Sequence, residues 1–250
     1  MNVTDIANMM IFLGSALCVG IGAVGSGLGE GLIGAKAMTA LGKQQKANSE
    51  LMQTMLISAA VTETGSIFCL VIGLVMIFSF VGLPAESIDY ARALSFLGAG
   101  LAVGIGVVGP SVSAGLTGAE ACAGVGRNPS DCNIITTNML ICQALTQTSA
   151  IFALIVSLLL LYLIPNQLEG ISIPMQYAKG AAYLGAALGS GIVTIGSATG
   201  IGQITSKSIK YSSRFKENSG VFLRTMFVGT AVTETVTIYS LVIAFLLILR

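Results

Sequence analysis

Three glutamates lie well inside long apolar stretches of this chain: Glu30, Glu63 and Glu234. An ionised carboxylate in hydrocarbon costs several kcal/mol, about 2.5–3.5 kcal/mol on insertion scales. Each must therefore be protonated, be neutralised by a bound cation, or lie in a hydrogen-bond network between helices. Glu63 and Glu234 recur at the same point of a repeated unit, which favours reversible ion binding over packing. The aligned residue of the unit between them is Gln147, which has the same shape and cannot ionise.

Six apolar stretches that carry these residues are long enough to cross a bilayer, which takes about 20 residues. They are 9–35, 51–80, 93–119, 134–164, 180–204 and 221–249. Hydrophobic residues make up 54% and charged residues 9% of the 250 positions, so the bilayer is the natural solvent. Strands with open edges would leave backbone groups unpaired in lipid, so the spans are helices. We expect an all-α membrane protein of three tandem hairpins, 1–84, 85–168 and 169–250.

The three hairpins are copies of one unit. Moving residues 13–36 by 84 positions onto 97–120 gives 13 identities in 24 positions, and a further shift of 87 aligns the third copy. The second helices carry VTETGSIF, LTQTSAIF and VTETVTIY at 61–68, 145–152 and 232–239. Because each unit holds an even number of spans, the copies are parallel and no inversion is involved.

The first helix of each unit is rich in glycines spaced four apart, as in Gly25/Gly29 and Gly27/Gly31. In lipid, such spacing forms a face on which helix backbones approach closely. Glycine also weakens a helix, so we expect a closed ring of first helices, with the second helices outside, to hold them. Residues 20–25 match GxGxxG, but a dinucleotide site needs a preceding strand and a later ribose-binding acid. We assign this motif to packing.

The composition excludes several classes of function. The chain has no histidine, so a Ser-His-Asp triad, a histidine-ligated metal and a histidine proton shuttle are excluded. It has no tryptophan and a net charge of +1, so nothing indicates nucleic-acid binding. The five cysteines form no CxxC pair and fit neither a disulfide framework nor a zinc site. We interpret them as small buried apolar residues and expect no organic cofactor.

The loops predict the orientation in the membrane. Eight cations lie in the turns of the hairpins, and three lie between hairpins or at the termini. The positive-inside rule therefore predicts cytoplasmic hairpin turns and both termini outside. We expect the membrane to be the cell membrane of a bacterium or an archaeon. The first ten residues lack the basic start of a signal peptide, so we expect them to be retained.

Three motifs resemble one family: GSGLGEG (25–31), RNP (127–129) and QALTQT (143–148). Over nearly the whole chain, the sequence resembles the c subunit of F-type rotary ATP synthases. Members of that family have one hairpin per chain, or usually two in V-type rings, so three hairpins are a departure. The resemblance implies a homo-oligomeric ring in membrane lipid that turns against a stator a subunit and grips the central-stalk subunits. It also implies that this chain is not itself an enzyme, because ATP chemistry lies in partner subunits.

The resemblance also implies roles for individual residues. By position, Glu63 and Glu234 carry the ion, and Gln147 carries nothing. Val61 and Val232 match a position whose carbonyl oxygen is a ligand in sodium-type members. The residues that match the loop contacting the stalk are Lys43, Gln44, Arg127, Asn128 and Arg214.

Sodium-type members have Ser or Thr directly after the glutamate, Tyr five residues later, and Gln or Glu on the first helix. The hydroxyl position holds Thr64, Thr148 and Thr235, and the phenol position holds Phe68, Phe152 and Tyr239. Glu30 takes the first-helix position, which would make a two-carboxylate site with Glu63 in which one acid stays protonated. Oxygen ligands suit a hard cation, so we favour Na+ at the Glu63 and Glu234 sites, with H+ as the alternative.

Two points about these ligands stay open in the sequence. In the third hairpin, an ungapped alignment puts Ile201 at the first-helix position, whereas a two-residue gap puts Gln203 there. Positions five apart on a helix differ by about 140°, so we expect Tyr239 to face the site of a neighbouring hairpin. A channel or secondary transporter that uses the same glutamates is the alternative function, although transporters of this kind usually have broken helices around the site.

Overall fold

The computed structural model describes residues 2–83, 88–164 and 171–250, which form helices and no strand. The first hairpin comprises α1 (Val3–Lys43) and α2 (Asn48–Phe80). In the second hairpin, α3 (Tyr90–Gly106) and α4 (Val108–Arg127) precede α5 (Cys132–Tyr162). The third comprises α6 (Ile173–Ser212) and α7 (Ser219–Leu249). The expected hairpin limits at 84/85 and 168/169 fall outside the described residues.

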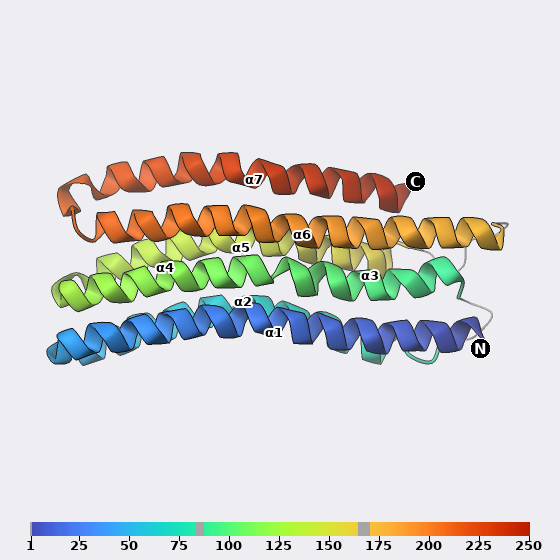
Figure 1. Ribbon diagram of the computed structural model, residues 1–250, viewed down its shortest axis with the longest axis horizontal. Coiled ribbons are helices and arrows are strands. Elements are labelled where there is room, and N and C mark those ends of the chain that lie inside the picture. Colours follow the sequence, from blue (N-terminus) through green and yellow to red (C-terminus); the bar gives the residue numbers. More distant parts are fainter. Residues whose placement is uncertain (1, 84–87, 165–170) are drawn as a thin grey trace.

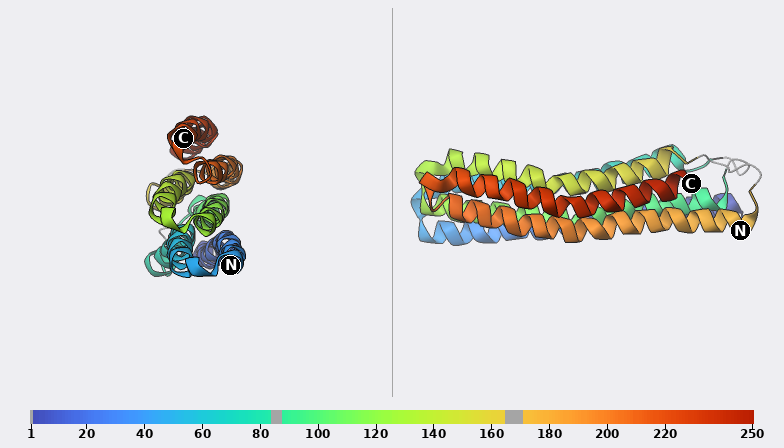
Figure 2. Two further views of the ribbon diagram at one scale, coloured as in Figure 1. Left: turned by 90° about the vertical axis from the view of Figure 1, so that its left-hand side faces the viewer. Right: turned by 90° about the horizontal axis from the view of Figure 1, so that it is seen from above.

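The helices lie side by side along one axis, with the hairpin turns at one end and the chain termini at the other (Figure 1). Seen end-on, the first helices of the hairpins form one row and the second helices form another (Figure 2). Six helical segments of the described chain are long and apolar enough to span a membrane, one of them being α3 and α4 together. The expected all-α membrane architecture of three hairpins is therefore confirmed.

The third span contains Pro110, which divides its helix into α3 and α4. Pro110 has no N–H to donate to the carbonyl of Gly106 and crowds the preceding turn. The helix accordingly stops at Gly106 and resumes at Val108, with Val107 between them at φ −91° and ψ −13°. The two segments remain nearly collinear, so the hairpin keeps its place in the row (Figure 1).

Each hairpin turn repeats one backbone conformation, which supports the triplication at the level of local structure. Gln44, Asn128 and Phe215 occupy equivalent positions, with φ/ψ of −141°/78°, −135°/80° and −119°/75°. Each is followed by a three-residue 3₁₀ turn: Gln45–Ala47, Pro129–Asp131 and Lys216–Asn218. The stalk-matching residues Lys43, Arg127 and Arg214 therefore stay in register in three dimensions.

The first helices are in contact through glycine faces. A methyl group on Gly25 would lie 2.6 Å from Cα of Val108, and one on Gly109 would lie 2.7 Å from Cα of Ile195. These distances are far below van der Waals contact, so only glycine permits this approach of α1, α4 and α6. Helix association without a hydrophobic driving force depends on such close backbone packing in lipid.

The core consists of two apolar clusters separated along the bundle axis. One cluster lies toward the termini and includes Phe96 and Leu160, and the other lies toward the turns and includes Met139 and Ile209. Many of the buried side chains at the level between them are small and polar, among them Ser26, Ser58, Thr62, Ser111 and Thr205. All five cysteines are buried, as expected of small apolar residues.

Candidate functional site

The glutamates of the first hairpin lie at this polar level. The hydroxyl of Ser26 donates to the carbonyl oxygen of Thr62 at 3.3 Å, which fixes the register of α1 against α2. Glu63 follows Thr62 and is exposed, and Glu30 is half-buried one turn after Ser26. The Ser26–Thr62 contact therefore places Glu30 and Glu63 on facing helices, within about one turn of the same level. The pairing of their carboxyl groups stays a prediction.

Gln147 bridges the first and second hairpins. Its side chain on α5 is 8% exposed, and Nε2 donates to the carbonyl oxygen of Val61 on α2 at 3.4 Å. Its other terminal atom, Oε1, is buried with no hydrogen-bond partner among the described residues. An amide nitrogen therefore lies beside the carbonyl oxygen that the sequence assigned to ion binding.

Glu234 occupies the equivalent position in the third hairpin. The hydroxyl of Ser197 donates to the carbonyl oxygen of Thr233 at 3.1 Å, which reproduces the Ser26–Thr62 contact of the first hairpin. Glu234 is partly buried, and its Oε1 is buried without a hydrogen-bond partner in the described chain. A buried, unpaired carboxylate oxygen in an apolar span requires a proton or a cation.

Three further predicted residues lie on the free face of α7. Val232 and Tyr239 are 66% and 67% exposed, and the hydroxyl of Thr235 donates to the carbonyl oxygen of Val232 at 2.8 Å. They share a helix with Glu234, but no described residue covers this face. Thr64 occupies the matching place on α2, where its hydroxyl points to the carbonyl oxygen of Ala60 at 3.5 Å.

The register of α6 bears on the choice between Ile201 and Gln203. A methyl group on Gly202 would lie 2.5 Å from Cβ of Ser113, and one on Gly115 would overlap Gly29 in the same way. The shift of 87 thus continues through residue 202 without a gap. Ile201, which is fully buried, takes the position of Glu30, whereas Gln203 is exposed.

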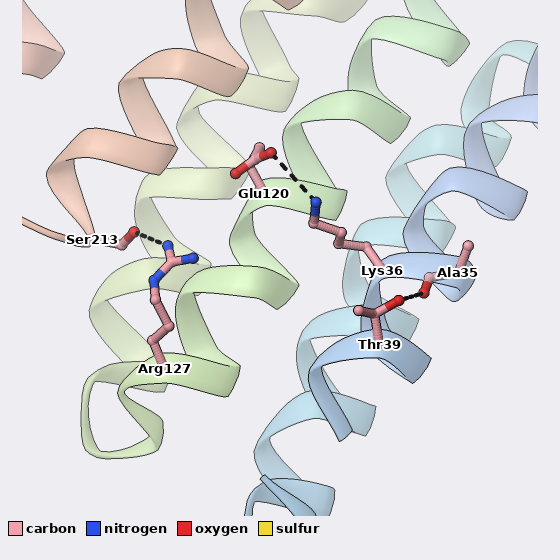
Figure 3. Close-up of polar contacts among 6 residues, drawn as sticks. All are labelled: Ala35, Lys36, Thr39, Glu120, Arg127 and Ser213. Carbon is pink, nitrogen blue, oxygen red and sulfur yellow. Dashed lines mark hydrogen bonds and ion pairs between the residues drawn. The ribbon is translucent and has the colours of Figure 1, made fainter. Parts of the chain in front are cut away.

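The turns of the hairpins gather positive charge around a cavity of about 490 Å³. Its lining residues include Lys36, Lys43, Arg127, Lys210, Arg214, Gln44 and Glu120. Nζ of Lys36 lies 3.9 Å from Oε1 of Glu120, and Nη2 of Arg127 donates to Oγ of Ser213 at 3.1 Å (Figure 3). Asn128 donates from Nδ2 to the carbonyl oxygen of Ser213 at 3.5 Å.

Comparison with known proteins identifies the family. The family model for the c subunit of ATP synthase matches this chain three times in tandem, over residues 13–76, 97–160 and 184–247. Together, the matches cover most of the chain.

The chain belongs to the ATP synthase c subunit family. The ATP synthase c subunit of Dehalococcoides mccartyi is 40% identical over 72 residues, which are 29% of this chain and 95% of that protein. Its counterpart in Petrotoga mobilis is 44% identical over 66 residues, or 26% of this chain and 69% of that protein. The ATP synthase c subunit of Thermotoga maritima is also 44% identical over 66 residues, which are 78% of its length. Each relative thus matches about one hairpin's length of this chain.

Membership in the c subunit family identifies the chain as a membrane component of an ion-translocating rotor, with catalysis in other subunits. Members of this family form a ring and work with the other subunits of the ATP synthase. The rotor function is therefore favoured over a channel or secondary transporter.

Sequence reasoning missed two buried polar residues of this c subunit. Arg92, counted as a loop cation, is 2% exposed, and it donates to the carbonyl oxygens of Leu160 and Leu161 at 2.8 and 2.5 Å. Gln143 is fully buried and donates from Nε2 to Oγ of Ser58 at 2.7 Å. Repeat alignment offered a signal for Arg92, because the equivalent residues are the polar Asn8 and Lys179.

Proposed function

We propose that this rotor protein transports Na+ across the membrane by reversible binding at Glu63 and Glu234, while Gln147 marks a site that carries nothing. The observation that supports this most directly is the Oε1 of Glu234, which is buried, unpaired and at the polar level of the bundle. At the equivalent position, the Gln147 amide nitrogen donates to a carbonyl oxygen instead. The amide of Gln147 cannot ionise, so burying it creates no charge that a cation would have to neutralise.

The ring is supported by two free faces that match interfaces inside the chain. On α1, Gly20 and Gly27 have nothing within 4 Å of an added methyl group, and on α6 the same holds for Gly185 and Gly196. By the repeat shifts, Gly20 corresponds to Gly104 of α3, where such a group would lie 2.9 Å from Cα of Cys18. A second copy can therefore dock α6 on α1 as α1 docks on α3 and α4. Repetition of this contact places the closely packed first helices inside and the second helices outside.

Na+ is favoured over H+ by the oxygen-rich surroundings of the carriers. Thr148 and Thr235 each lie in the turn next to a carrier site, and Tyr239 adds a phenol on α7. Hydroxyl and carbonyl oxygens are ligands for hard cations, whereas a proton-carrying carboxylate needs none of them.

The distribution of charge supports the orientation in the membrane and the contact with the stalk. We place the hairpin turns in the cytoplasm, since the turns hold most of the cations. There the basic residues around the 490 Å³ cavity, with Gln44 and Asn128, contact the central-stalk subunits of the ATPase head. We place the stator a subunit against the second helices, which lie outside in the proposed ring and carry Glu63 and Glu234.

Labelling with dicyclohexylcarbodiimide tests the proposal, because the reagent modifies protonated carboxyls in apolar sites. The intact membrane complex is treated with and without Na+, and the labelled peptides are identified by mass spectrometry. We expect label on Glu63 and Glu234 that Na+ suppresses. Label that Na+ does not change would make this a proton ring, and no label on either residue would refute their role as carriers.

A further inference from the structure

A row of polar side chains lies between α2 and α5, the second helices of the first two hairpins. We call this row the polar seam, and its members are Glu50, Thr54 and Ser58 on α2, and Thr136, Gln143 and Gln147 on α5. The members on α2 are spaced four residues apart, and those on α5 are spaced seven and four apart. Each set therefore shares one face of its helix. The seam begins near the hairpin turns and ends at the level of the carriers.

Polar contacts join the two helices along the seam. Nearer the turns, the hydroxyl oxygens of Thr54 and Thr136 lie 3.0 Å apart and share a hydrogen bond. Deeper in the bundle, Nε2 of Gln143 donates to Oγ of Ser58 at 2.7 Å. The contact of Gln147 with α2, described above, is the deepest. Hydrogen bonds of this kind are one means by which helices associate in lipid.

The seam holds more acceptors than its own donors can satisfy. Oε1 of Gln143, Oε1 of Gln147 and Oε2 of Glu50 are buried without a hydrogen-bond partner in the described chain. Gln143 is fully buried, and its Nε2 also donates to the carbonyl oxygen of Ala114 at 3.0 Å. Turning this amide over would place Oε1 against that carbonyl oxygen, so its orientation is fixed. A buried oxygen of this kind requires a donor.

Water is the donor that fits these oxygens. Buried waters characteristically bind polar groups that the protein itself leaves unpaired. The unpaired oxygens occur at the mouth of the seam, on Glu50, and at its inner end, on the two glutamines. Hydroxyl groups, which both donate and accept, lie between them. Helices that were merely held together by hydrogen bonds would not need surplus acceptors at both ends of the row.

The matching contact between α5 and α7 lacks such a row. There, the repeat shifts place Ile134 at the mouth and Leu223 at the next level. Deeper still, Sγ of Cys142 lies 3.1 Å from Sδ of Met226. Asn138 keeps a polar side chain on α5, but the apolar and sulfur-bearing residues interrupt the row. The polar seam is therefore particular to the contact that ends at the neutral glutamine.

We propose that the polar seam holds a file of water molecules that enters from the hairpin turns and ends at Gln147. The carboxyl group of Glu50 lies at its entrance, and the amide oxygens of Gln143 and Gln147 accept from water at its inner end. A proton or a small cation can follow such a path between polar side chains in a membrane protein. The position without a carboxylate is thus open to solvent from the turns, whereas Glu234 has no such path. The inference goes beyond the proposed function and does not depend on which ion the carriers bind.

Silver ions test the water file, because Ag+ is small and reaches a buried thiol only through water. Gln143→Cys places a thiol in the seam beside the native Cys142, which lies at the same depth, faces Met226 and serves as the internal control. The intact complex in lipid nanodiscs is treated with Ag+. Thiols that remain free are then alkylated in the unfolded chain and counted by mass spectrometry. We expect silver to block the introduced thiol about tenfold faster than Cys142, since a hydrated thiol ionises more readily than one in apolar surroundings.

A second substitution tests whether the path runs from the turns. Thr136→Val keeps the shape of the side chain and removes a hydroxyl from the seam. Added to Gln143→Cys, it should slow the reaction of the introduced thiol about tenfold, because the file loses a hydrogen-bonding partner. Thr137→Val is the matched control and should have no effect, since Thr137 is exposed and its hydroxyl donates within its own helix to the carbonyl oxygen of Asn133 at 2.8 Å.

The unmodified complex provides a test that needs no variant to assemble. In an electron cryo-microscopy map that resolves ordered water, we expect density within hydrogen-bond distance of Oε1 of Gln143 and Oε1 of Gln147. Protein donors at both oxygens in place of water would overturn the inference. Equal rates at the introduced thiol and Cys142, or no effect of Thr136→Val, would also overturn it. None of these results changes the labelling of Glu63 and Glu234, so the proposed ion transport stands or fails separately.

Discussion

Restoring a carboxylate at Gln147 tests the idea that the second hairpin is a silenced ion site. Gln147→Glu removes the amide group that donates to the carbonyl oxygen of Val61 at 3.4 Å. A protonated carboxyl group can donate to the same oxygen in its place. The cost is then within about 0.5–1.5 kcal/mol, the value of one hydrogen bond. We expect the ring to assemble and position 147 to react with the carbodiimide.

The expected gain follows from counting carriers. Each chain would hold three instead of two, so Na+ transported per ATP hydrolysed should rise about 1.5-fold, provided that each acid is loaded once per turn. The assay is uptake of radioactive Na+ into liposomes that contain the purified complex, with ATP hydrolysis measured in parallel. Gln147→Leu serves as the control and should leave the ratio unchanged.

One result would refute the reasoning. If the Gln147→Glu ring assembles and hydrolyses ATP normally, yet its new carboxyl takes no label and the ratio stays constant, the position is not an ion site. The neutral residue would then be a packing element, and the shape of a site would not be preserved in the second hairpin.

Three other perturbations give distinct results. Gly25→Ala places a methyl group against the backbone of α4 and should lower the free energy of unfolding of the isolated chain by roughly 1–3 kcal/mol. Gly20→Ala should leave the stability of the chain unchanged and block ring formation on native gels. An equal loss of chain stability in both variants would contradict the proposed free face. Arg92→Met leaves two buried carbonyl oxygens at the end of α5 unpaired and should cost roughly 1–3 kcal/mol in the same assay, with unchanged stability as the opposing result. Arg127→Gln should reduce Na+ transport per ATP while carbodiimide labelling of the carriers stays normal, and unchanged coupling would remove this residue from the stalk contact.

Much of this fold follows from patterns that need no packing information. Apolar length predicts the six spans, and the repeat shifts predict that Lys43, Arg127 and Arg214 occupy one place in three identical turns. The intramembrane acids stand out for the same reason, since a charge in an apolar span has few uses other than binding. These inferences use only local sequence and the properties of the bilayer.

Contacts between helices are harder to predict from the sequence. The alignment left Ile201 and Gln203 as alternatives, and only the approach of Gly202 to Ser113 fixes the register of α6. Arg92 reads as a loop cation because sequence does not show that its guanidinium reaches the end of α5. The sequence marks the carbonyl oxygen of Val61 as a ligand without showing which side chain it meets, and in the structure it accepts from Gln147 of the next hairpin. Such pairings depend on how hairpins dock.

The lack of a carboxylate at Gln147, between Glu63 and Glu234, also has a consequence for the timing of rotation in the proposed rotor. Around a ring of identical chains, Glu234 is followed after one hairpin by Glu63 of the adjoining copy, but Glu63 is followed by Glu234 only after two. A stator that loads and unloads acids in turn would meet a short interval and then one twice as long. The rotor would turn in alternating short and long steps, and the long step would have to be completed by elastic energy stored in the stalk or by thermal motion. Because the three hairpins belong to one chain, this alternation is fixed by the covalent structure, and rings of any size would keep it.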